Sequence, residues 1–146
     1  MSRTGPEPLP PLVARHLVVG WSLLLVYVVL GSVLEALHGF KVGWYVDAGS
    51  STRRLMWTLA HAHGVLLGLV NVAFAATAFI LPRTTARAVQ ASLVLLAASL
   101  LLPAGFLLGG IGIHGGDPGL GILLTPAGGA LLVLALVLAL TCVRAR

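Results

Sequence analysis

The sequence predicts an all-α integral membrane protein, a single domain over residues 1–146 built as an up-down-up-down four-helix bundle. Two observations predict this fold class. The composition is 58% hydrophobic and only 9% charged, with a mean hydropathy of +1.03, whereas about a quarter of the residues of a soluble domain are charged. The chain also contains four apolar runs that are long enough to cross a bilayer. We expect the helices at about 13–38, 55–81, 88–110 and 120–143.

The first predicted helix follows a proline-rich lead-in over residues 1–12 and contains the uncharged run 17–34. At the helical rise of 1.5 Å per residue this run extends about 27 Å. It is too long for the apolar region of a cleaved signal, so we expect it to be retained. Its polar and small side chains recur along one stripe, which we expect to face protein because lipid would leave a carboxylate unpaired. The stripe consists of Tyr27, Gly31, Glu35 and His38.

The second predicted helix, residues 55–81, has no charged residue but carries two histidines and an asparagine. A loop over 39–54, with interfacial aromatic residues, precedes it. Positions two apart on a helix point about 200° away from each other, so His61 and His63 should face different neighbours. His61 shares its side with residues that suit close helix packing, namely Gly64, Gly68, Asn71 and Ala75.

Prolines and glycines mark the second half of the chain. We expect a polar hairpin over 82–87, a kink at Pro103 in the third helix, and a glycine-rich loop over 109–121. Pro126, with two glycines after it, should interrupt the fourth helix.

Four spans place both termini on one side, and the basic residues indicate which side. The termini and the second loop contain six arginines, whereas the other side contains three basic residues: Lys41, Arg53 and Arg54. The positive-inside rule therefore places both ends in the cytoplasm of a plasma (inner) membrane. The basic residues form no patch with interleaved aromatic residues, so we expect no nucleic-acid partner. The predicted partner of these charges is the lipid bilayer.

This topology brings the histidines and acids toward the outer face and leaves an inner half of Leu, Val and Ala. Imidazole and carboxylate groups are the common ligands of copper, iron and zinc. Glu35 and His38 are three residues apart, as in the Glu-x-x-His element of metal-binding bundles, and His61 and His114 would complete the set. The first hypothesis is therefore an outer-leaflet histidine cluster that binds a transition metal or haem, in a redox-associated subunit.

A local resemblance supports the haem form of this hypothesis. The string Ala62-His63-Gly64-Val65 resembles the second helix of the catalytic subunit of haem-copper oxidases, where the histidine of a similar string is an axial haem ligand. The resemblance implies that His63 is a haem ligand. It covers four residues, and the copper-ligand helix of that family is absent, so it does not imply oxygen reduction.

Other classes of function are also compatible with the sequence. The histidines and Asn71 would serve equally in a structural or accessory subunit without a cofactor, as part of a homo-oligomer or a larger membrane complex. A small transporter is a third possibility. No known catalytic motif is present, so the sequence favours a protein that is not an enzyme. The single cysteine, Cys142, excludes a disulfide within the chain.

Overall fold

The computed structural model describes residues 8–81 and 85–144, and the regular structure of these residues is helical apart from one isolated β-bridge between His114 and Asp117. Its four long helices are α1 (Pro11–Gly39), α3 (Ser51–Ile80), α4 (Ala86–Gly109) and α5 (Leu124–Arg144). Three short helical segments connect them: α2 (Gly43–Val46), η1 (Ala48–Ser50) and η2 (Leu120–Leu123).

All four long helices are long and apolar enough to cross a membrane. Their most apolar windows have mean hydropathies between 1.8 and 2.4. The prediction of an all-α chain with four candidate membrane spans is therefore confirmed.

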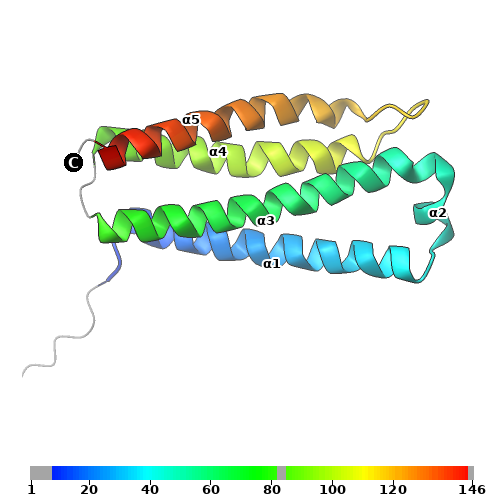
Figure 1. Ribbon diagram of the computed structural model, residues 1–146, viewed down its shortest axis with the longest axis horizontal. Coiled ribbons are helices and arrows are strands. Elements are labelled where there is room, and N and C mark those ends of the chain that lie inside the picture. The colour runs from blue at the N-terminus through cyan, green and yellow to red at the C-terminus, as the bar shows by residue number, and fades with distance from the viewer. Residues whose placement is uncertain (1–7, 82–84, 145–146) are drawn as a thin grey trace, which may run out of the picture.

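The long helices lie lengthwise beside one another (Figure 1). α1 packs against α3, α3 against α4, and α4 against α5. We call the end of the molecule where α1 and α4 begin and α3 and α5 end the terminal end, and the opposite end the loop end. The C-terminus lies at the terminal end (Figure 1).

The first two spans begin earlier in the chain than predicted. α1 begins at Pro11, inside the expected lead-in, because proline is well suited to the first helical position. α3 begins at Ser51, so Arg53 and Arg54 belong to its first turn and not to the loop. Residues 1–7 of the expected lead-in and 82–84 of the expected hairpin lie outside the described residues.

The fourth span is helical from Leu120, as expected, but its first turn is not α-helical. Residues Leu120–Leu123 form the 3-10 helix η2, and α5 begins only at Leu124. Pro126 therefore falls in the first turn of α5, where a backbone N–H has no partner within the helix, and it does not interrupt the helix. Pro103 does lie inside α4, and the helix continues past it to Gly109.

Glycines allow two of the helix pairs to approach closely. A Cβ on Gly20 of α1 would lie 2.9 Å from Gly68 O of α3, and a Cβ on Gly128 of α5 would lie 2.5 Å from Leu102 N of α4. Gly64, Gly68, Asn71 and Ala75 are all buried, which confirms the packing face predicted for the second span. Small residues thus bring α3 against α1, and α5 against α4.

Candidate functional site

The most deeply buried polar side chains meet around His16, near the start of α1. His16, Asn71 of α3 and Ser92 of α4 are fully buried, and Ser99 of α4 is 3% exposed. His16 Nδ1 lies 2.7 Å from Asn71 Oδ1, and His16 Nε2 lies 2.8 Å from Ser92 Oγ. We call these four residues the polar network. It connects α1, α3 and α4.

The hydrogen-bonding groups of the polar network satisfy one another. Because the Asn71 Oδ1 atom only accepts, His16 donates from Nδ1–H, and the neutral ring accepts at Nε2 from the Ser92 hydroxyl. Asn71 Nδ2 donates to Leu67 O and to Ser99 Oγ, both at 2.8 Å. Ser99 in turn donates to a carbonyl one turn earlier in α4 at 2.7 Å. Within the described part of the chain, no buried side-chain nitrogen or oxygen lacks a partner.

Two further side chains adjoin the polar network. Arg15 Nη2 donates to Ser92 Oγ, so this hydroxyl accepts one hydrogen bond while it donates another. The Phe74 ring of α3 lies 4.6 Å from the His16 ring between centroids, tilted by 56°. The imidazole is therefore held at both nitrogens and covered by an aromatic side chain.

His16, Asn71 and Ser92 can meet because they lie at a similar distance from the terminal ends of their helices. His16 is five residues past the start of α1, Asn71 nine residues before the end of α3, and Ser92 six residues past the start of α4. At 1.5 Å per residue, all three lie about 8–14 Å from the terminal end of their helices. Hydrogen bonds across helices at one depth remove the cost of polar groups in a lipid environment.

This network was not predicted from the sequence. The half of the spans toward the terminal end, expected to consist of Leu, Val and Ala, also contains the buried His16, Asn71 and Ser92. One signal was available: His16 is an ionisable residue within a span, and such residues pair inside the protein or line a site. Asn71 and Ser92, at a similar distance from the terminal ends of their own helices, were the partners to consider.

His61 faces α1. Its Nδ1–H donates to Tyr27 O at 2.6 Å, and its ring lies against Gly31, where a Cβ would collide with it. The half-buried His61 ring thus fills the space that a glycine leaves on the neighbouring helix. This contact confirms the prediction that His61 lies on the packing face of its helix.

His63 faces α4 instead. Its Nδ1–H donates to Leu59 O, one turn earlier in α3, at 2.8 Å. The ring stacks on Phe106 of α4 with 4.8 Å between centroids and is half-buried. The prediction that the two histidines of the second span face different neighbours is therefore confirmed.

The other predicted ligands lie at the loop end and are exposed. Glu35 and His38 follow Leu34, the last buried residue of α1, so the expected buried stripe stops before them. His114 lies in the loop after α4, where its backbone pairs with Asp117 and its Nδ1–H donates to Gly112 O at 3.3 Å.

These residues do not come together as one ligand set. In residues 8–81 and 85–144 there is no group of three or more His, Cys, Asp or Glu side chains placed to hold a metal ion. The structure therefore does not join Glu35, His38, His61 and His114 in a single cluster. The assignment of each residue as a ligand stays a prediction.

Arginine and aromatic side chains order the loop end. Arg54 donates to Tyr45 O at 2.7 Å and to Asp47 O at 2.8 Å, and Arg53 donates to Gly110 O at 3.2 Å. The Tyr45 ring is 3% exposed and stacks on Trp57. Burial raises the pKa of the Tyr45 hydroxyl, and the Arg54 charge partly opposes that rise. Arg54 thus connects residues 45–47 to α3, and Arg53 connects the end of α4 to α3.

No family model, curated protein or solved structure matches this chain. The site must therefore be interpreted from its own geometry.

Proposed function

We propose that the chain is a structural or accessory subunit of a membrane assembly, in which polar groups inside the spans hold the helices together and bind no cofactor. The proposal includes an up-down-up-down four-helix bundle in the plasma (inner) membrane with both termini in the cytoplasm. Its partners would be the lipid bilayer and either further copies of the chain or a larger membrane complex.

The observation that carries this proposal is the polar network. A polar residue inside a membrane span is costly and usually has a function. The four side chains of the polar network form hydrogen bonds with one another and with backbone carbonyls. Cross-helix hydrogen bonds of this kind support helix association. Holding three helices together is therefore a sufficient role for these residues.

A second candidate function is haem binding at His63, the role that the resemblance to haem-copper oxidases implies. One observation favours it: His63 donates from Nδ1–H to Leu59 O, which leaves the Nε2 lone pair of the neutral ring for a ligand. Ligating histidines commonly donate their other ring N–H to a carbonyl in this way. His63 would supply one axial nitrogen, with Phe106 packing beside it.

A visible absorption spectrum and an elemental analysis of the full chain, purified in mild detergent from cells supplied with iron and haem precursor, separate the two candidates. The subunit proposal predicts a folded, colourless and metal-free protein. A Soret band that disappears in His63→Ala and persists in His114→Ala, the exposed loop histidine, would support haem and overturn the subunit proposal. Stoichiometric copper, iron or zinc that is lost in His61→Ala or His38→Ala would overturn it in favour of a metal site.

A further inference from the structure

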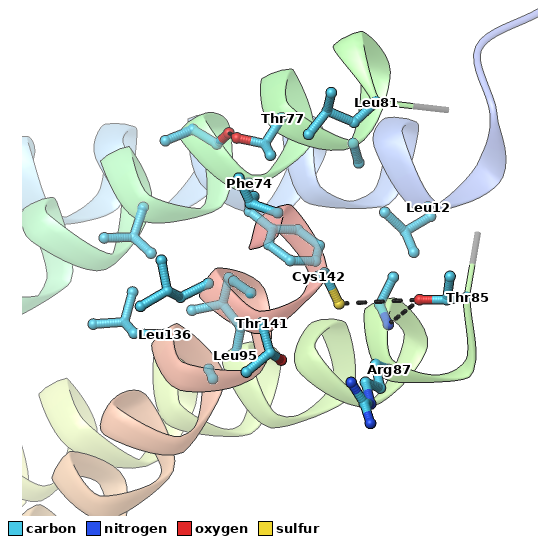
Figure 2. A pocket seen from close by; sticks show the side chains of 18 of the residues that line it. Leu12, Phe74, Thr77, Leu81, Thr85, Arg87, Leu95, Leu136, Thr141 and Cys142 are labelled. Atoms are coloured by element: carbon cyan, nitrogen blue, oxygen red, sulfur yellow. Dashed lines mark hydrogen bonds between the residues drawn. The ribbon is translucent and has the colours of Figure 1, made fainter. Parts of the chain in front are cut away.

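An apolar pocket of about 670 Å³ opens between α3, α4 and α5 at the terminal end. Figure 2 shows it with Phe74 on the α3 side, Leu95 on the α4 side and Leu136 on the α5 side. Its volume falls in the range of about 300–1,000 Å³ that is typical of small-ligand sites. It lies at the opposite end of the molecule from the histidines singled out in the sequence.

The packing of the helices and the small size of the side chains produce this space. α3 and α5 both pack along α4 and make few contacts with each other. Several alanines line the gap between them, among them Ala73 of α3 and Ala139 of α5. An apolar cavity offers water few hydrogen-bond partners, so a hydrocarbon group suits it better.

The rim of the pocket is polar and positively charged. Figure 2 shows Thr85 beside Cys142, and the hydroxyl oxygen lies 4.0 Å from the sulfur. Arg87, on the first turn of α4, also lines the pocket. In the described part of the chain, the charged residues toward this end are all basic: Arg15, Arg87 and Arg144. The described acidic residues all lie toward the loop end: Glu35, Asp47 and Asp117. This end of the molecule therefore attracts an anion.

We propose that the pocket binds one acyl chain of an anionic phospholipid, whose phosphate lies against Arg87. The apolar walls accept the chain, and the exposed guanidinium at the rim provides the charge complementarity that distinguishes an anionic headgroup from a zwitterionic one. A lipid from the surrounding leaflet has the required geometry, since its chain and its phosphate occupy adjacent depths of the bilayer. The site goes beyond the proposed subunit function and does not depend on it.

Native mass spectrometry of the full chain in detergent tests this site. The protein is titrated with phosphatidylglycerol and, separately, with phosphatidylcholine of identical acyl chains. We expect one phosphatidylglycerol per chain to be retained about fivefold more strongly than phosphatidylcholine, the factor expected for one basic residue near an anionic group. Arg87→Gln should abolish this preference. Lys41→Gln, which removes the same charge at the loop end, should keep it.

Filling the pocket separates bound lipid from general attraction to the charged surface. Ala139→Phe should lower the retention of both lipids, whereas Ala130→Phe, on an exposed position of α5 outside the pocket, should not. Ala73→Phe repeats the test from the α3 wall if the α5 variant fails to fold by circular dichroism. Equal retention of the two lipids, unchanged retention in both pocket-filling variants, or lipid-free dimers that disappear in those variants would overturn the proposal.

Discussion

His16 shows how much the neighbours of a polar residue determine its role in a membrane span. Each ring nitrogen has a partner on a different helix, Asn71 Oδ1 on α3 and Ser92 Oγ on α4. Asn71 is central to the network because it accepts from the ring and donates twice, to Leu67 O and Ser99 Oγ. Removing the Asn71 amide therefore removes three hydrogen bonds and leaves the His16 N–H buried without an acceptor.

We expect Asn71→Ala to lower the free energy of unfolding by about 1–2 kcal/mol, since hydrogen bonds between membrane helices contribute about 0.6 kcal/mol on average and up to about 1.7. Unfolding in mixed micelles, followed by circular dichroism, measures this change. Ser32→Ala is the control, because the exposed Ser32 hydroxyl bonds only to Val28 O of its own helix. It should change stability by less than about 0.5 kcal/mol. Equal effects of the two variants would contradict a structural role for Asn71.

The polar network should also make substitutions at His16 and Asn71 non-additive. Either single substitution to leucine leaves a buried polar group without a partner, whereas the double variant removes both groups. We expect the loss of stability in His16→Leu/Asn71→Leu to be smaller than the sum of the single losses by about 0.5–3 kcal/mol. The same unfolding assay completes this cycle, and strict additivity would show that the two side chains act independently.

At the scale of elements, glycines determine how closely α5 approaches α4. Gly128 and Gly129 are adjacent in the first turns of α5, but only Gly128 faces α4. A Cβ at Gly128 would lie 2.5 Å from Leu102 N, which is backbone and has little freedom to move away, whereas a Cβ at Gly129 would meet nothing within 4 Å. The two positions therefore form a matched pair.

We expect Gly128→Ala to destabilise the protein by about 1–3 kcal/mol, the usual cost of overpacking. Gly129→Ala should leave the stability unchanged or raise it by up to about 1 kcal/mol, because alanine favours the helix more than glycine does. Thermal unfolding in detergent compares the two variants. Similar stability of both would mean that α4 and α5 do not approach each other at Gly128.

The elements were more predictable than the site. Hydropathy alone located the four spans, because nearly every residue inside a membrane helix is apolar. The 3-10 form of Leu120–Leu123 was not predicted because a short apolar 3-10 turn and an apolar α-helix have similar composition. The polar network was missed because it depends on relative depth in three helices. The periodicity of each helix by itself correctly placed Gly31 of α1 and His61 of α3 on packed faces. The predicted stripe on α1 extended too far, because Glu35 and His38 lie beyond Leu34, the last buried residue of that helix.

At the scale of the whole molecule, the two ends differ in chemistry. The terminal end contains the polar network, the apolar pocket and only basic charges among its described residues. The loop end contains the exposed Glu35 and His38, the interfacial aromatic residues and all the described acids. In the sequence, the termini and the 82–87 segment contain six arginines, against three basic residues in the rest of the chain. The positive-inside rule associates such a bias with the cytoplasmic side, and this is the basis of the proposed orientation.

Cysteine labelling tests the proposed orientation directly. In a Cys142→Ser background, Asp117→Cys places a thiol in the exposed loop after α4, and Arg144→Cys places one at the exposed end of α5. A membrane-impermeant maleimide should label Asp117→Cys in intact cells, whereas Arg144→Cys should react only after permeabilisation. The reverse pattern would place the terminal end on the outer side of the membrane. The anionic lipid of the pocket would then come from the outer leaflet. Labelling of both thiols in intact cells would show that residues 117 and 144 lie on the same side, and α5 would then not cross the membrane.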